Sequence, residues 1–285
     1  MSLLPSATEI VADLGLADDL VGVSAECRWP AEVIGKPVVS AARVDLSELT
    51  SAQIDATVRA SIQDGASLYA VDAELIDELR PDVILTQDLC EVCAVSGGEL
   101  SSACPVGARI VSLDPTTFGE VARSVERLAA QLGVPDRGAR IAGEMWAKVR
   151  AVEAAVAGQP RPRVFVAEWL DPPFCAGHWV PEMVALAGGE ELLGVAGAPS
   201  HPVSWEEVMR SDPEVTVLSP CGYGADEAAQ RAAGLRLPGR RVVAVDGDGY
   251  YSRPAPRLAD GVRQLGHLLH PGLVPDPGLP AIDLR

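Results

Sequence analysis

The sequence predicts an α/β protein of two α/β lobes, joined by a long rigid helix, with a ligand cleft between the lobes. Short β-like runs alternate with helical segments along the chain, a pattern typical of parallel sheets covered by helices. One helical stretch, 136–157, is far longer than the others. The alternation then resumes after a Gly-Gln-Pro-Arg-Pro break at 158–162. We therefore divide the chain into an N-terminal lobe (1–117), a linking helical segment (118–162) and a C-terminal lobe (163–285).

The first lobe is predicted from its apolar runs and the helical segments between them. Strands are expected at 21–24, 37–39, 83–85 and 109–113, and helices at 8–14, 51–60 and 73–79. A further helix, expected at 118–131, begins the linking segment. Thr8 and Glu9 follow Pro5 and Ser6, so a hydroxyl stands beside an acidic first turn, which favours a helix start there.

The linking helix is predicted from apolar residues that recur at helical spacing. They are Ile141, Met145, Val149, Val152 and Val156. A helix over 136–157 would be roughly 33 Å long at 1.5 Å per residue, which is the length of a small domain.

The second lobe repeats the α/β pattern. Strands are expected at 163–167, 215–218 and 241–245, and helices at 182–187, 205–210, 226–233 and 255–269. The Pro-rich tail, 271–285, is expected to form a surface strap.

Composition narrows the classes of partner. The net charge is −17, which disfavours nucleic acid and anionic membrane surfaces because both are polyanions. No apolar run reaches the roughly 18 residues needed to cross a bilayer, so membrane insertion is not expected. The first residues lack a basic start, an apolar signal core and a small-residue cleavage site, so we expect a cytoplasmic protein.

The loop that follows the strand at 163–167 is the strongest candidate site. The chain has only five Trp, four Tyr and three Phe, yet Trp169, Phe174 and Trp179 all fall here, with His178 among them. Ligands in open α/β sheets bind outside the carboxyl ends of the strands. A neutral imidazole at this position can coordinate a metal, including the metal of a corrin or haem.

Other aromatic residues fall on loops at the same predicted edge. They are Tyr223, Tyr250 and Tyr251 in the second lobe, with Trp29 as a facing wall from the first lobe. Aromatic rings provide the large apolar contact area that a flat macrocycle needs. Five carboxylates are expected near this edge, and paired carboxylates there suit acid–base chemistry or metal binding, with solvated loop charge as the alternative: Glu26, Glu168, Asp171, Glu182 and Asp248.

Cys90 and Cys93 form a C-x-x-C pair just after the strand at 83–85. The spacing suits a metal or a redox pair, but no second such pair exists and the context is acidic. Three interpretations of this pair stay open: buried structural cysteines, a ligand or metal contact lining the cleft, and a redox pair. The candidate metal ligands are Cys90, Cys93 and His178.

Several segments together resemble a known superfamily. Residues 2–9 read Ser-Leu-Leu-Pro-Ser-Ala-Thr-Glu, and 79–85 read Leu-Arg-Pro-Asp-Val-Ile-Leu, with Asp-Pro-Glu-Val at 212–215 as the second-lobe counterpart. Residues 246–250 and 256–258 are similar to its closing ligand loop and final helix. The chain thus resembles the helical-backbone metal receptors, the class III periplasmic binding proteins for cobalamin, haem and ferric siderophores. The cobalamin-binding branch is the most similar.

The resemblance implies a substrate-binding protein that holds cobalamin or a related metal chelate between its lobes and works with an ABC permease. Pro5 and Ser6 of the opening motif join the candidate ligand contacts. The chain departs from the family pattern in its early first strand, in an extra segment at 47–69 and in the cysteine-containing run at 88–93. Two alternatives therefore stay open. One is a cytosolic zinc or iron enzyme using Cys90, Cys93 and His178, and the other is a ligand-sensing regulatory module.

Overall fold

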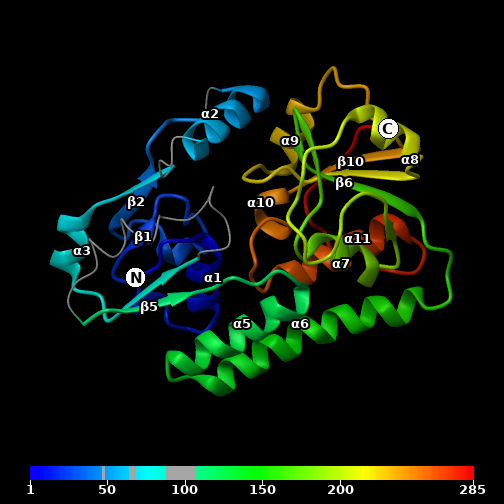
Figure 1. The fold of residues 1–285 in the computed structure, drawn as a ribbon. Coiled ribbons are helices and arrows are strands. Elements are labelled where there is room, and N and C mark those ends of the chain that lie inside the picture. Colours follow the sequence, from blue (N-terminus) through cyan, green and yellow to red (C-terminus); the bar gives the residue numbers. More distant parts are fainter. Residues whose placement is uncertain (47–48, 64–67, 88–106) are drawn as a thin grey trace. The chain divides into compact units, whose positions relative to one another are not determined.

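The computed structural model describes residues 1–46, 49–63, 68–87 and 107–285. The chain forms two compact units, each with α/β structure (Figure 1). Unit 1 contains Met1–Pro115 and Ser124–Ile141, and unit 2 contains Thr116–Arg123 and Ala142–Arg285. The predicted two-lobed α/β fold is confirmed. The cleft between the lobes stays a prediction.

Unit 1 is built on a sheet that is completed by the first residues of the chain. Its strands are β1 (Val23–Ser24), β2 (Val38–Ala42), β3 (Tyr69–Val71), β4 (Val83–Thr86) and β5 (Arg109–Ser112). The first three pair in the order β1-β2-β3, and β4 pairs with β5 in parallel. Ser2 forms parallel bridges to both Val23 and Leu85, so the opening segment lies between β1 and β4.

The helices of unit 1 begin and end at residues suited to those positions. They are α1 (Pro5–Asp13), α2 (Ser51–Gln63) and α3 (Ala73–Leu79), with short 3₁₀ turns at Ala17–Asp19 and Ala31–Val33. Pro5 occupies the first turn of α1, where its missing N–H costs no hydrogen bond. Asp72 caps α3 by accepting a hydrogen bond from the Leu75 N–H at 3.0 Å.

Two helices contribute to both units. They are α5 (Phe118–Gln131) and α6 (Pro135–Val156). Gly133 adopts a φ of +80° in the turn between them, and Pro135 is the first residue of α6. At 22 residues, α6 is about 33 Å long and matches the predicted linking helix.

The sheet of unit 2 has the order β11-β10-β9-β6-β7, with β8 also paired to β6. Its strands are β6 (Arg163–Leu170), β7 (Pro173–Cys175), β8 (Glu190–Glu191), β9 (Val215–Leu218), β10 (Arg241–Val245) and β11 (Ala281–Asp283). The strands β6, β9 and β10 run parallel, so their carboxyl ends meet at one edge. The strands β7 and β11 are antiparallel to their neighbours.

Helices cover both faces of this sheet (Figure 1). They are α7 (Val180–Leu186), α8 (Trp205–Ser211), α9 (Ala225–Arg231) and α11 (Leu258–Leu269), while the short α10 (Gly247–Tyr250) follows the end of β10. Phe165 and Leu218 of the sheet pack against Val208 of α8 and Ala228 of α9 in one buried cluster. Burial on both faces explains why β6, β9 and β10 are nearly continuous apolar runs.

One expectation about the C-terminal tail was incomplete. The tail was predicted as a surface strap, but Ala281–Asp283 forms β11 at the edge of the sheet. Arg241 holds it through two hydrogen bonds to the Asp283 carboxylate, at 2.8 and 3.1 Å. Within the residues that the structure describes, no helix is long and apolar enough to cross a bilayer.

Candidate functional site

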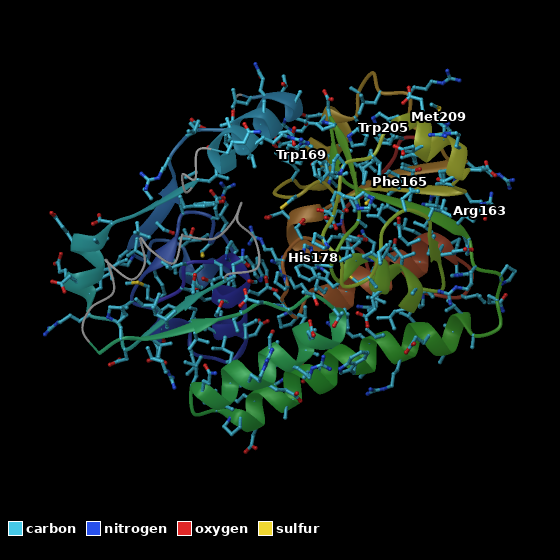
Figure 2. All side chains as sticks on the ribbon, viewed as in Figure 1. Arg163, Phe165, Trp169, His178, Trp205 and Met209 are labelled. Carbon is cyan, nitrogen blue, oxygen red and sulfur yellow. The ribbon has the colours of Figure 1, made fainter. Side chains whose placement is uncertain are left out.

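The candidate site is built on the carboxyl edge of the unit 2 sheet. Trp169 lies near the end of β6, and the segments after β9 and β10 carry Tyr223 and Tyr250. Figure 2 shows Trp169 and Arg163 at opposite ends of β6. This arrangement follows from parallel pairing, which brings the carboxyl ends of neighbouring strands together.

Trp169 and Tyr223 form a stacked aromatic pair. Their ring centroids are 5.6 Å apart and their planes differ by 28°. The Arg231 guanidinium lies 4.2 Å from the Tyr223 ring centroid and adds a cation–π contact. Phe174 is the cross-strand partner of Trp169, so the two side chains leave the same face of the β6–β7 pair. These three aromatic residues form what we call the aromatic platform, namely Trp169, Phe174 and Tyr223.

The segment after β10 is held by polar contacts. The Asp246 carboxylate accepts a hydrogen bond from the Gly249 N–H at 2.8 Å, and burial raises the Asp246 pKa. Arg253 binds the Asp248 carboxylate with two hydrogen bonds, at 3.0 and 2.7 Å. Tyr250 is half-buried, and the Arg257 guanidinium lies 5.4 Å from its ring centroid. Tyr250 is thus placed at the same sheet edge as the aromatic platform.

His178 lies on a constrained loop, residues 176–179, which we call the His178 loop. It adopts a φ of +50°, unusual for a residue other than glycine. The His178 N–H donates to the Ala198 carbonyl at 2.6 Å, and its own carbonyl accepts from the Gly197 N–H at 2.8 Å. Burial lowers the His178 pKa, so its imidazole is neutral at pH 7. A neutral imidazole can both donate and accept hydrogen bonds.

Two predicted ligand contacts are buried and bonded to other residues of unit 2. Trp179 is buried, and its indole N–H donates to the Tyr251 carbonyl at 2.7 Å. The Tyr251 ring is 1% exposed, and its hydroxyl donates to Gln264 at 2.9 Å. Both residues were predicted as ligand contacts because they stand beside His178 and Tyr250. The local sequence does not show which aromatic side chain points into the core. The part of Trp179 and Tyr251 in a ligand site stays a prediction, and the aromatic platform is defined without them.

The remaining predicted residues lie elsewhere. In unit 1, Pro5 begins α1 and is half-buried, Ser6 is buried, and Trp29 is 47% exposed. Their part in a ligand site stays a prediction. Cys90 and Cys93 lie outside the described residues, so their metal role is untested. Among the described residues, no group of three or more His, Cys, Asp or Glu side chains is arranged to hold a metal ion.

The carboxylates at this edge take different roles. Glu182 accepts a hydrogen bond from the Phe118 N–H at 2.7 Å and so caps α5. Burial raises the pKa of Glu168 to about 7, so this side chain is not solvated loop charge. Glu191, which sequence reasoning did not select, has a pKa raised by burial to about 8. It stands in the polar-looking run Gly-Gly-Glu-Glu at 188–191, where no periodicity marks a buried position.

Cys175 and His201 lie close together without forming a catalytic pair. The Cys175 Sγ is 3.2 Å from Nδ1 and 3.5 Å from Nε2 of His201. Nearly equal distances to the two ring nitrogens place the sulfur over the ring rather than in its plane. Burial also raises the Cys175 pKa, which opposes a reactive thiolate.

A family model describing periplasmic binding proteins matches residues 1–236. The chain belongs to the periplasmic binding protein family. A vitamin B12-binding protein of Yersinia pestis is 27% identical over 273 residues, covering 93% of this chain and 84% of that protein.

Solved structures of the family share this fold. The periplasmic vitamin B12 binding protein of Vibrio cholerae superposes with a TM-score of 0.68 and 24% identity, over 94% of each chain. A periplasmic heme binding protein of Pseudomonas aeruginosa gives a TM-score of 0.71 at 21% identity, over 95% of this chain and 92% of that one. The family resemblance predicted from the sequence is confirmed.

Proposed function

We propose that this protein is a substrate-binding protein for cobalamin or a related tetrapyrrole metal chelate. The observation that carries the proposal is the aromatic platform at the carboxyl edge of the unit 2 sheet, in a chain related over 93% of its length to a vitamin B12-binding protein. A macrocycle offers a broad apolar face, and large rings held by their neighbours bind such a face with little loss of side-chain entropy.

The chemistry of the site suits this class of ligand. Tyr223 is held between its contacts with Trp169 and Arg231, so the platform is ordered before a ligand arrives. A neutral His178 offers hydrogen bonds to peripheral amide or carboxylate groups without bringing a charge. Recognition therefore depends mainly on apolar contact, with polar groups setting orientation.

Titration with cyanocobalamin and, separately, with hemin tests the proposal. The purified protein should bind at least one of them with saturable quenching of tryptophan fluorescence. Trp169→Ala should weaken that affinity by about tenfold or more, since loss of about 1.4 kcal/mol is a factor of ten. Isothermal titration calorimetry should report the same loss, because the substitution itself removes one fluorophore.

Trp205→Phe is the matched control. Trp205 begins α8 and packs edge-to-face on Phe165, with ring centroids 6.1 Å apart, in the core cluster against α8 and α9 (Figure 2). This variant should keep the parent's affinity. Equal affinity of Trp169→Ala and the parent would remove the platform from the site, and no binding of either compound would refute the ligand class.

The binding function also implies a protein partner. We infer an ABC permease as the partner that receives the ligand, because the family resemblance implies one. Copurification of the ligand-loaded protein with a permease tests this inference. No observation among the described residues favours the enzyme alternative.

A further inference from the structure

A buried carboxyl group ties together the segments that carry the candidate site. Glu168 lies where the β6–β7 register shifts between Ala167 and Trp169, and such a bulge redirects a side chain. Its Oε1 accepts a hydrogen bond from the Gly177 N–H at 2.9 Å, next to His178. Its backbone carbonyl accepts from the Cys221 N–H at 3.1 Å, two residues before Tyr223.

A second carboxyl group supports the same loop from another strand. The Glu191 Oε1 accepts hydrogen bonds from the Leu193 and Gly194 N–H groups, at 3.4 and 3.3 Å. Gly194 lies so close to the Ala176 carbonyl that a Cβ there would collide with it. The segment held by Glu191 is therefore packed against the His178 loop.

Glu191 has an oxygen that the fold leaves without a partner. Its Oε2 is shielded from solvent and makes no hydrogen bond among the described residues. An ionised carboxylate with a solvent-shielded oxygen is costly. Hydrogen bonds from the Gly194, Leu193 and Val166 backbone N–H groups lower the Glu191 pKa, but burial outweighs them. The protonated form carries no net charge and avoids most of that cost.

The electrostatic surroundings reinforce protonation. Burial is the main cause of the raised pKa of both Glu168 and Glu191, and the charge of Glu168 raises the Glu191 pKa further. The Cys175 thiol, which contacts His201, also lies near both carboxyl groups. No Lys or Arg in the described part of the chain forms an ion pair with either carboxyl group.

We propose that Glu168 and Glu191 are positioning residues that hold the His178 loop in a proton-dependent way, so that ligand binding at this site weakens as the pH rises from slightly acidic to alkaline. The proposal rests on the proposed binding function and adds its regulation. The protonated pair keeps the loop packed over the strand ends. When both groups ionise, the repulsion between the two charges and the cost of keeping them away from water favour a loosened His178 loop. The aromatic platform then no longer has this loop packed beside it.

Hydrogen exchange and unfolding measurements test the proposal without any ligand. After correction for intrinsic exchange rates, peptides covering 175–201 should be less protected at about pH 8.5 than at about pH 6.5. A carboxyl pKa raised by folding adds stability that is complete below its unfolded value, near 4.5. That stability is lost as the pH rises through about 7 for Glu168 and about 8 for Glu191, so the free energy of unfolding should fall over this range.

Glutamine variants separate proton dependence from simple structural support. Glu168→Gln and Glu191→Gln keep an acceptor oxygen but cannot ionise, so each should reduce both pH effects while folding normally. Glu168→Ala should lose protection of the His178 loop at every pH. Glu190→Gln, at the exposed neighbouring position of β8, should behave like the parent.

Ligand titration at two pH values is the second test of the proposal. The parent's dissociation constant for cyanocobalamin or hemin should rise at least about threefold between about pH 6.5 and pH 8.5, and the glutamine variants should flatten that rise. If neither compound binds, the proposed function fails. The hydrogen-exchange and unfolding measurements still test whether Glu168 and Glu191 hold the His178 loop in a proton-dependent way. Protection of 175–201 that does not change with pH, or that changes equally in Glu191→Gln, would overturn the inference.

Discussion

At the scale of single residues, Gly177 is the position where the candidate site tolerates least change. A Cβ built there would collide with the Ser200 backbone nitrogen and lie 2.7 Å from the Pro199 carbonyl carbon. Gly177→Ala should therefore force the two segments apart, break the hydrogen bond to Glu168 and cost about 2 kcal/mol or more in the free energy of unfolding. Urea denaturation measures this cost.

Gly143→Ala is the matched control for that substitution. Gly143 is an exposed residue of α6, and a Cβ there would meet no atom within 4 Å beyond the helix's own backbone. It should stabilise the protein by about 0.5–1 kcal/mol, because alanine is the better helix former. A Gly177→Ala variant as stable as the parent would contradict the close packing of 177 against 199–200.

Residue-level prediction placed Trp169 near the carboxyl end of its strand, but it put Trp169 and Phe174 on a loop, whereas they lie in β6 and β7. It failed where packing decides, because neighbouring aromatics such as His178 and Trp179 differ in burial through long-range contacts. Glu191 was missed for the same reason, since its burial depends on the fold around it and not on its local sequence.

At the scale of elements, α8 offers a direct test of how local sequence sets a helix boundary. Ser204 and Glu207 form a capping box, in which each side chain bonds the other residue's backbone N–H, at 3.2 and 2.7 Å. Ser204→Ala should cost about 1 kcal/mol in thermal or urea unfolding. Ser211→Ala, at the other end of α8, should cost clearly less, and equal costs would contradict the cap.

The longer strands were predictable, and among the shortest only β1 was, within the strand expected at 21–24. The apolar runs that became β6, β9 and β10 are long enough to mark strands by themselves. The two- and three-residue strands β3, β7, β8 and β11 carry no such signal, since pairing with a neighbouring strand alone defines them. The bulge that redirects Glu168 arises from the pairing of β6 with β7, so it too was beyond sequence reasoning.

At the scale of the whole molecule, the long helix and the α/β rhythm on either side of it predicted two lobes. A periodic run such as Ile141 to Val156 depends only on local geometry, which is why α6 was predicted closely. The choice of ligand is a different kind of property. It depends on how a few side chains meet at the sheet edge, and composition constrains it only by excluding polyanions.

The net charge of −17 gives a prediction for the molecule as a whole. Excess like charge destabilises a compact state by self-repulsion, and salt screens that repulsion. Raising NaCl from about 0.01 M to 0.15 M shortens the screening length from about 30 Å to 8 Å. We expect the melting temperature in differential scanning calorimetry to rise by about 2 °C or more, equivalent to about 1 kcal/mol.

Choline chloride at the same ionic strength should give the same rise, because screening does not depend on the identity of the cation. A rise with sodium alone would indicate a bound cation, and a fall with both salts would show that attractive ion pairs outweigh the repulsion.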